Sequence, residues 1–488
     1  MATKTNLPLF IGGKACKAIS RKSFENINPA TGEKISDVEQ AGRRDIEKAV
    51  VAARKGFVIW SAMSGTERGR ILIKAAQILR ERRKELAEIE VRDTGKPISE
   101  AMVVDIDSGA DALEFFGGLA ADIKGDHHDL GASAFAYTRR EPLGICAGIG
   151  AWNYPMQIAC WKTAPALACG NSMIFKPSEM TPTNAFMLAG VLKQAGLPDG
   201  VYNVVHGMGE TGHLLASHPD IDKISFTGSV PTGKLVLKDA AETVKYVTME
   251  LGGKSPLIIF DDSQLDNAVG AAMNANFYTQ GEVCSNGTRV YVHEDIHDDF
   301  IDALKKRTEA MIIGDPMHAK TQVGSLINKN HLEKVLEYVR LGIEEGAYLV
   351  SGGEEVDVKK LPGGSFMSPA IFTACQDDMR ICREEIFGPV MSVMSFREED
   401  EVINRANDTE LGLSAGVFTQ NLARAHRVVA KLRAGTCWIN NYNLTPIGVP
   451  FGGYKQSGIG RENAASALEH FTQVKSVYVE LGDVECDY

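Results

Sequence analysis

The sequence predicts an α/β protein with two parallel sheets, and three observations lead to this prediction. Short apolar runs alternate with amphipathic segments from about residue 144, and a second series of the same kind begins near Pro256. Such alternation is typical of a parallel sheet covered by helices on both faces. The third observation is the length, because 488 residues suffice for about three domains, or for two domains and an extension.

The first series consists of five expected strands with helical segments between them. The strands are expected at residues 145–151, 172–175, 201–205, 223–226 and 246–249. One of the helices is expected at residues 184–194, because the turn sequence Gly-Leu-Pro-Asp-Gly follows it at 196–200. Before this series, apolar residues at helical spacing predict one long helical region over residues 45–94.

The second series has the same character. Strands are expected at residues 257–260 and 289–292, and helices at 266–278 and 298–311. Near the carboxyl end, residues 473–481 alternate in polarity as an exposed or edge strand does. We expect this strand to form a subunit contact, because an unpaired edge readily accepts another chain.

Composition excludes several classes of protein. Hydrophobic residues make up 44% and charged residues 24% of the chain, which argues against a disordered, collagen-like or coiled-coil protein. The formal charge is −11, since 63 acidic residues outnumber 52 Lys and Arg. The mean field therefore repels a polyanion, and we expect no nucleic-acid partner.

The cysteines and the apolar stretches indicate a cytoplasmic protein. Nine cysteines without a CxxC pair fit neither a disulfide framework nor a zinc knuckle, and they suit a reducing compartment. The first residues contain too short an apolar run for a secretory signal. Residues 142–161 and 434–454 carry no charge but contain Asn and Pro, so we expect buried strands and turns there and no membrane partner.

Two motif matches lack the secondary structure that their chemistry needs. His293-Glu-Asp-Ile-His297 fits HExxH, but a strand precedes it and the next helix begins after His293, so the two imidazoles would not share a helical face. Gly412-Leu-Ser-Ala-Gly416 fits GxSxG, but Ser414 leads into a strand instead of a helix. We expect neither a zinc site nor a serine nucleophile.

Two glycine-rich motifs bear on phosphate binding. Gly228-Ser-Val-Pro-Thr-Gly233-Lys234 has the spacing of a phosphate loop but lacks the hydroxyl residue that holds magnesium, because Leu235 stands there. A strand before it and a helix after it would still aim free N–H groups at a dinucleotide phosphate. Gly207-Met-Gly-Glu-Thr-Gly212 fits GxGxxG, but the next strand ends without an acid for the ribose, so this fingerprint is weak.

A fifth pattern combines a cysteine and a glutamate. Most single cysteines are packing residues, but Cys284 lies in the polar, glycine-containing segment Gly281-Glu-Val-Cys-Ser-Asn-Gly, which favours exposure of the sulfur. Glu250 follows an apolar strand and precedes Leu251-Gly-Gly, so it lies at the carboxyl end of a sheet strand, where ligands bind in α/β proteins. A thiol nucleophile and a carboxylate base suffice for acyl chemistry through a thioester.

Seven motifs, spread in order over nearly the whole chain, resemble the aldehyde dehydrogenase superfamily. They are Asn153-Tyr-Pro, Phe175-Lys-Pro-Ser-Glu179, Phe226-Thr-Gly-Ser-Val-Pro-Thr-Gly233, Glu250-Leu-Gly-Gly-Lys254, Cys284, Glu385-Ile-Phe-Gly-Pro389 and Gly452-Gly-Tyr-Lys-Gln-Ser-Gly458. Further segments resemble the branch that oxidises betaine aldehyde and 4-trimethylaminobutyraldehyde: Tyr137-Thr-Arg-Arg-Glu-Pro-Leu-Gly144, Trp161-Lys162 and Trp438-Ile-Asn-Asn-Tyr442. One departure is Glu282, where the family usually has Gln, and a carboxylate there is expected to raise the pKa of the Cys284 thiol.

The resemblance implies a domain organisation. A Rossmann-like NAD-binding domain would comprise residues 1–121 and 143–252, and an α/β catalytic domain would comprise residues 253–456. A β-ribbon for oligomerisation and the C-terminal segment would comprise residues 122–142 and 457–488. A homotetramer or a homodimer is expected.

The resemblance also implies a reaction, the NAD-dependent oxidation of betaine aldehyde to glycine betaine. Cys284 would attack the aldehyde carbon, and the Asn153 amide and the Cys284 N–H would hold the oxyanion of the thiohemiacetal. Glu250 would activate the water that hydrolyses the thioester. Lys162 and Glu462 would relay protons, or would form a structural ion pair.

The ligand-binding residues follow from the same resemblance. NAD would meet GSVPTG and not GMGETG, and the residues expected to hold it are Ala151, Trp152, Lys176, Pro177, Ser178, Glu179, Gly228, Ser229, Thr232, Gly233, Gly252, Glu385 and Phe387. A quaternary ammonium substrate would be bound by an aromatic lining formed by Tyr154, Trp161, Tyr278 and Phe451. Potassium sites are expected near Ile27, Asp93, Lys455 and Gly458.

Other functions stay open from the residues alone. The substrate can instead be 4-trimethylaminobutyraldehyde or aldehydes in general, for which the aromatic rings would form a simple apolar pocket. A cysteine thioester hydrolase or acyl transferase would use Cys284 and Glu250 without a nicotinamide. A non-catalytic structural role is disfavoured by the intact Cys, Glu and Asn set.

Overall fold

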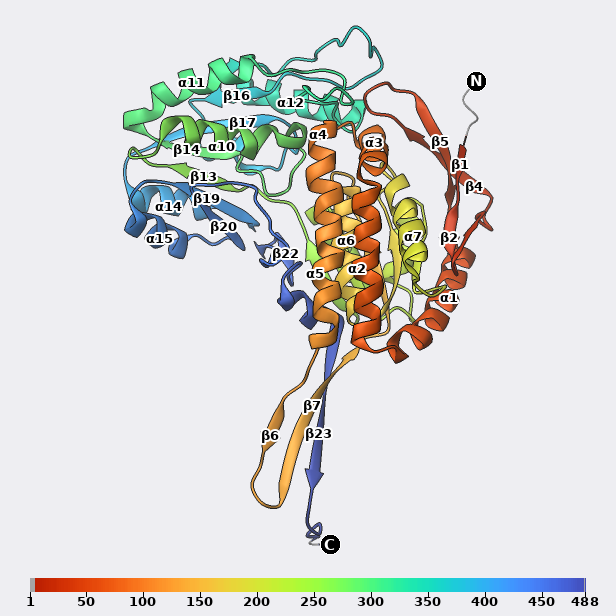
Figure 1. Cartoon of the computed structure of the whole chain (residues 1–488). Coiled ribbons are helices and arrows are strands. Elements are labelled where there is room, and N and C mark those ends of the chain that lie inside the picture. The colour runs from red at the N-terminus through yellow and green to blue at the C-terminus, as the bar shows by residue number, and fades with distance from the viewer. Residues whose placement is uncertain (1–4, 487) are drawn as a thin grey trace.

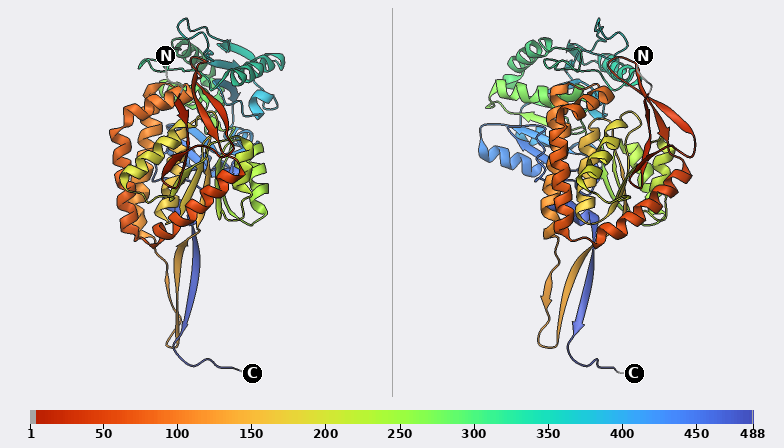
Figure 2. Two further views of the ribbon diagram at one scale, coloured as in Figure 1. Left: turned by 90° about the vertical axis from the view of Figure 1, so that its right-hand side faces the viewer. Right: turned by 45° about the vertical axis from the view of Figure 1, so that its right-hand side comes forward.

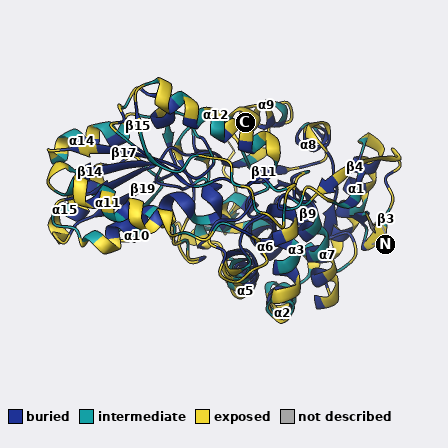
Figure 3. Cartoon of the chain, turned by 90° about the horizontal axis from the view of Figure 1, so that it is seen from above, coloured by how far each residue is buried: buried dark blue, intermediate teal, exposed yellow. Residues whose placement is uncertain are grey.

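The computed structural model describes residues 5–486 and 488, and it consists of two α/β units with a three-stranded stalk (Figure 1). The stalk projects from the body in every view, and the carboxyl terminus lies beyond its tip (Figure 2). Both sheets are buried inside their units, while the outer helical faces are exposed (Figure 3). The α/β prediction is confirmed.

The first unit contains an eight-stranded sheet with the order β22-β12-β11-β8-β9-β10-β2-β3. The five expected strands form its parallel centre, and they are β8 (Ile145–Ile149), β9 (Ser172–Lys176), β10 (Tyr202–Val204), β11 (Lys223–Thr227) and β12 (Tyr246–Glu250). Antiparallel strands flank them: β2 (Leu9–Ile11), β3 (Lys14–Cys16) and β22 (Gly458–Ile459). A separate small sheet contains β1 (Thr5–Leu7), β4 (Lys22–Ile27) and β5 (Lys34–Gln40).

Helices cover both faces of this sheet because successive strand residues point to opposite sides. Cys146 packs into the core beneath one layer of helices, whereas its neighbour Ala147 packs into the core on the opposite face. The helices of the first layer are α2 (Gly65–Glu81), α3 (Arg83–Thr94), α5 (Ser108–Leu119), α6 (Pro155–Ala168) and α7 (Thr183–Ala195). The opposite face carries α1 (Arg43–Ala62), α8 (Gly209–Ala216) and α9 (Val230–Ala241).

The expected long helical region over residues 45–94 is wrong as a single element, because it consists of α1, α2 and α3. Met63 is extended and ends α1. Ser64 then accepts a hydrogen bond from the Glu67 N–H, while the Glu67 carboxylate accepts one from the Ser64 N–H. This reciprocal cap starts a new helix, so a second helix begins where periodicity alone predicts that one helix continues.

The second unit contains a seven-stranded sheet with the order β15-β16-β17-β14-β13-β19-β20. Its strands are β13 (Pro256–Ile259), β14 (Arg289–His293), β15 (Tyr348–Ser351), β16 (Ala370–Thr373), β17 (Val390–Phe396), β19 (Ser414–Phe418) and β20 (Thr436–Ile439). One face packs against α10 (Leu265–Phe277) and α11 (His297–Glu309). The other face packs against α12 (Lys329–Glu344), α13 (Arg380–Arg383), α14 (Glu399–Asn407) and α15 (Leu422–Lys431).

The stalk is an antiparallel ribbon of β6 (His127–Asp129), β7 (Ala134–Pro142) and β23 (Thr472–Glu480). The expected strand near the carboxyl end is therefore present, and it pairs with β7 along its whole length, from Thr472 opposite Pro142 to Glu480 opposite Ala134. Val474 and Tyr478 are exposed on it. Within residues 5–486 and 488, no helix is both long and apolar enough to cross a membrane.

Short elements complete the chain. A helical segment with π-type hydrogen bonds, Ala101–Asp107, follows the single turn α4 (Ile98–Glu100) and leads into α5. Short 3-10 segments lie at Ala120–Asp122, Tyr278–Gly281, Glu294–Ile296 and Ala465–Phe471, and β18 (Leu411–Gly412) pairs with β21 (Tyr454–Lys455).

Candidate active site

A cavity of about 1010 Å³ lies between the two units. Four central strands of the first sheet end at its wall, with Ile149, Lys176, Thr227 and Glu250 as their last residues, in agreement with the rule that ligands bind at the carboxyl ends of parallel strands. Most predicted site residues line it: Ala151, Trp152, Asn153, Tyr154, Trp161, Lys176, Ser178, Glu179, Gly228, Ser229, Thr232, Glu250, Gly252, Tyr278, Cys284, Glu385, Phe387, Phe451 and Glu462. The remaining predicted residues Pro177, Gly233 and Lys162 are not among those that line the cavity.

Cys284 is the only one of the nine cysteines that lines the cavity. The turn before it is strained, because Thr279 and Gln280 both have left-handed backbones, with φ of 49° and 51°. The Cys284 residue as a whole is partly exposed. Burial raises the pKa of the thiol to about 12, and the nearby carboxyl groups of Glu385 and Glu250 contribute to this increase.

Glu282 is not among the main causes of the raised pKa of the Cys284 thiol, and its side chain is hydrogen-bonded elsewhere. Its carboxyl group accepts hydrogen bonds from the Ile327 N–H at 3.0 Å and from Gln280 at 3.2 Å. The side chain is buried, and this burial raises its pKa well above the usual range. The groups that raise the pKa of the thiol are Glu385 and Glu250.

Glu250 is a buried carboxyl group that faces the cavity. It is 5% exposed, and neither carboxyl oxygen has a hydrogen-bond partner among the described residues. Burial and the neighbouring Glu462 carboxylate raise its pKa well above the usual value. Glu462 forms an ion pair with Lys162, which also donates to Ser225 Oγ at 3.1 Å. The Lys162–Glu462 pair therefore affects the charge state of Glu250 without a direct hydrogen bond to it.

Asn153 presents one side of its amide to the cavity. Its Nδ2 donates to the backbone oxygen of Glu282 at 2.9 Å, which fixes the orientation of the amide. An amide carries two N–H donors, so the second hydrogen remains for a ligand.

The part of the cavity wall that comes from the first unit contains a charge pair and two helix N-termini. Lys176 Nζ lies 3.6 Å from a Glu179 carboxylate oxygen and donates to the oxygen of Pro177 at 2.9 Å. The start of α9 lines this wall with Gly228, Ser229 and Thr232. Gly209, Gly212 and His213 of α8 line it too, so GMGETG contributes more to the cavity than the sequence suggested.

Aromatic side chains surround the region next to Cys284. Trp161 and Phe451 meet edge to face with ring centroids 5.7 Å apart, and the Trp161 N–H donates to Ser108. The Tyr154 hydroxyl is hydrogen-bonded to Thr279 at 2.8 Å. The buried Lys96 ammonium lies 3.9 Å from the centroid of the Tyr154 ring, so one face of this ring is already occupied.

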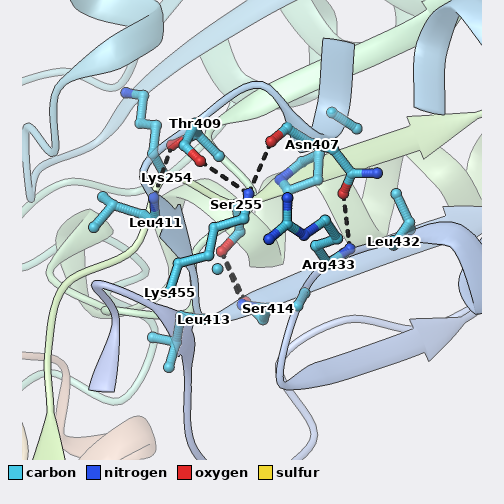
Figure 4. Close-up of a pocket in the computed structure, with 15 residues that line it drawn as sticks. Lys254, Ser255, Asn407, Thr409, Leu411, Leu413, Ser414, Leu432, Arg433 and Lys455 are labelled. Carbon is cyan, nitrogen blue, oxygen red and sulfur yellow. Dashed lines mark hydrogen bonds between the residues drawn. The ribbon is translucent and has the colours of Figure 1, made fainter. Parts of the chain in front are cut away.

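The residues expected near potassium fall into two groups. Asp93 is buried and accepts hydrogen bonds from Asn26 and Thr183, while the buried Oδ1 of Asn26 has no partner among the described residues. An unpaired oxygen next to a carboxylate suits a hard monovalent cation. Lys455 has a left-handed backbone and directs its ammonium to the oxygens of Asn407 and Thr409 (Figure 4).

Ser414 of the GxSxG match is buried near Lys455. It opens β19, and its hydroxyl donates to the Ser285 oxygen at 2.7 Å. Figure 4 shows its hydrogen bond with the Ser255 hydroxyl, at 2.9 Å. In the HExxH match, His293 ends β14 while His297 begins α11, so the two imidazoles do not lie on one helix. No cluster of three metal-ligating His, Cys, Asp or Glu side chains occurs in the described part of the chain.

Several cavity residues escaped the sequence reasoning. The π-type segment contributes Val103 and Val104, α12 contributes His331 and Lys334, and the loop after β20 contributes residues 443–445. No motif marks them, because they reach the cavity only through packing of distant elements.

Comparison with known proteins decides the family. The model of the "Aldehyde dehydrogenase family" matches residues 16–477. The chain belongs to the aldehyde dehydrogenase family. It is 58% identical to a protein of Vibrio vulnificus strain CMCP6 named betaine aldehyde dehydrogenase, over 98% of this chain and 99% of that one. A Brucella anthropi protein of the same name is 56% identical over 98% of both chains.

Solved structures of this family have the same fold. The structure of the NAD+ complex of an aldehyde dehydrogenase from Bacillus cereus has a TM-score of 0.96 and 42% identity, and the match covers 98% of this chain and 97% of that one. An NAD-dependent aldehyde dehydrogenase from Sinorhizobium meliloti has a TM-score of 0.97 and 38% identity, over 99% and 97% of the two chains.

Proposed function

We propose that this aldehyde dehydrogenase oxidises betaine aldehyde to glycine betaine with NAD as the hydride acceptor. The observation that carries this proposal is one continuous cavity with Cys284 and Glu250 next to a group of aromatic rings at one end and the Lys176–Glu179 pair at the other. The names of relatives that are 56–58% identical support the same substrate.

The residues at the far end of the cavity fit NAD. The N-terminus of α9 offers free N–H groups to a pyrophosphate, and Glu179 is placed to accept hydrogen bonds from a ribose. Gly252 leaves room for Glu385, since a Cβ there would lie 2.0 Å from the Glu385 carboxyl oxygen. Glu385 and Phe387 would hold the nicotinamide half. When bound, NAD supplies the electrophile that takes the hydride from the aldehyde carbon.

Cys284 and Asn153 carry out the first half of the reaction. The Cys284 thiol first loses its proton to solvent water. Its sulfur then bonds to the aldehyde carbon, and the electron pair of the C=O π bond moves to the oxygen, which becomes the oxyanion of the thiohemiacetal. The free Asn153 N–H and the Cys284 backbone N–H stabilise this charge, and each such donor is worth roughly 3 kcal/mol. Loss of hydride then leaves a thioester on Cys284.

Glu250 performs the second half by activating water. A carboxyl group with unpaired oxygens and a raised pKa is a stronger base than an exposed glutamate once ionised. Water loses its proton to Glu250 and attacks the thioester, which releases the acid. The Lys162–Glu462 pair lies next to Glu250 and would carry the proton away, while a purely structural ion pair is the alternative.

The aromatic lining supports a cationic substrate. A trimethylammonium group has no N–H to donate, so ring faces are its best partners, at about 0.5–2 kcal/mol each. Trp161, Phe451, Tyr278 and Tyr154 line the cavity, and Lys96 covers one face of the Tyr154 ring. 4-Trimethylaminobutyraldehyde carries the same trimethylammonium group on a longer spacer. It is therefore the second candidate substrate.

The proposal extends to domains, assembly and location. Residues 1–121 and 143–252 would form the NAD-binding domain, residues 253–456 the catalytic domain, and residues 122–142 with 457–488 the ribbon and C-terminal segment. The exposed apolar residues of β23 support a homodimer or homotetramer built through the ribbon. Nine free thiols support a cytoplasmic location, and the unpaired Asn26 oxygen supports potassium near Ile27 and Asp93, with a second site near Lys455 and Gly458.

Absorbance at the NADH band tests the function. Purified protein should produce NADH from betaine aldehyde and NAD, whereas the folded Cys284→Ala variant should bind NAD and form no acid. Hydrolysis of a thioester without NAD, together with no NADH from any aldehyde, would favour the thioester hydrolase instead.

A further inference from the structure

Phe387 has a backbone conformation that non-glycine residues rarely adopt. It lies in the loop between α13 and β17, and its φ is +64°. A side chain disfavours this left-handed conformation, which persists only where neighbouring contacts hold it. The Phe387 ring packs against the edge of Trp152 with centroids 5.1 Å apart, so the strained backbone places an aromatic ring in the cavity wall.

Two residues of α12, one helical turn apart, hold this loop. The Nε2–H of His331 donates to the backbone oxygen of Phe387 at 2.7 Å. Val335 packs so closely on Gly388 that a Cβ there would lie 2.7 Å from Val335 Cγ2. Residues i and i+4 share a helical face, so α12 presents both contacts together.

His331 also touches the segment that carries Cys284. Glu282 Oε1 lies 3.8 Å from His331 Nε2 and accepts the Ile327 N–H, just before α12 begins. The Phe387 oxygen can only accept a hydrogen bond, which places the imidazole proton on Nε2. Burial lowers the pKa of His331 to about 4, so the ring is neutral at physiological pH.

We propose that His331 is a positioning residue that ties the Phe387 loop to α12, whose start is held to the Cys284 segment by the hydrogen bond from the Ile327 N–H to Glu282. This inference rests on the proposed function, in which Phe387 meets the nicotinamide. The hydrogen bond from His331 holds the Phe387 ring in place before NAD binds, so it should affect the rate of hydride transfer more than the affinity for NAD. The affinity depends largely on the adenosine contacts, which lie at the other end of the cavity.

The test is the rate of the first NADH turnover in His331→Ala, compared with the dissociation constant for NAD. We expect the burst to slow about tenfold or more while the dissociation constant changes less than about threefold, because orientation and not affinity is lost. His331→Gln, which retains an N–H donor, should recover most of the rate. The matched control is His206→Ala, which removes a buried ring outside the cavity whose Nε2 faces the Pro8 oxygen at 3.2 Å. It should leave the burst unchanged.

A double-mutant cycle tests the role of Glu282. Glu282→Leu removes the acceptor of the Ile327 N–H at the start of α12 and should slow the burst, and its effect should be less than additive with that of His331→Ala. A normal burst in folded His331→Ala, an equal loss in the Ala and Gln variants, or strict additivity would overturn the inference. A wild-type protein that forms no NADH from any aldehyde would instead refute the proposed function.

Discussion

The substitution Trp161→Leu tests whether the aromatic lining recognises positive charge. Trp161 is 5% exposed and lies at the cavity wall beside Phe451, so a trimethylammonium group in contact with it would be largely desolvated. A desolvated cation gains about 1–2 kcal/mol from such a ring, which corresponds to a factor of roughly 5–30 in kcat/KM. Leucine keeps an apolar wall but removes this attraction.

The assay compares betaine aldehyde with 3,3-dimethylbutanal, its uncharged carbon analogue. Loss of apolar contact affects both aldehydes, so the ratio of their kcat/KM values isolates the charge effect. We expect this ratio to fall roughly 5- to 30-fold in Trp161→Leu and to change little in Trp161→Phe, the matched control that keeps a ring. If wild-type protein uses the two aldehydes equally well, or if Trp161→Leu impairs both to the same extent, the reasoning is wrong and the pocket is a general apolar one.

Three further predictions concern carboxyl groups of the site. Glu250→Gln should give a burst of about one NADH per site followed by very slow turnover, because only hydrolysis of the thioester needs the base; absence of a burst in stopped-flow absorbance would mean that Glu250 forms the thiolate. NAD should have a higher kcat/KM than NADP, since Glu179 repels a 2′-phosphate that Lys176 only partly offsets, and equal values would contradict this assignment. Burial raises the pKa of Glu385 to about 7, so the carboxylate that accepts ribose hydroxyls is populated above this pH. NAD affinity, measured by fluorescence titration, should therefore increase as pH rises through 7 in wild-type protein and stay flat in Glu385→Gln.

Local sequence determined the order of the elements and the chemistry of the site. The apolar runs that predict strands at 223–226 and 246–249 became β11 and β12, each within one residue, because a buried parallel strand needs a continuous apolar run and little else. Cys284 and Glu250 could be selected from their surroundings, since polar and glycine residues just beyond a strand or helix leave a side chain free to meet a ligand.

Tertiary structure decided which distant groups act on one another. Lys162 and Glu462 are 300 residues apart in sequence and still form an ion pair, and Lys96 covers one face of the Tyr154 ring from another element. The direction of Glu282 toward Ile327 and His331, away from the Cys284 thiol, depends on where α12 packs. Spacing along the chain contains no information about such contacts, because they are set by the packing of two sheets and their helices around a shared cavity, and that packing is a property of the whole core.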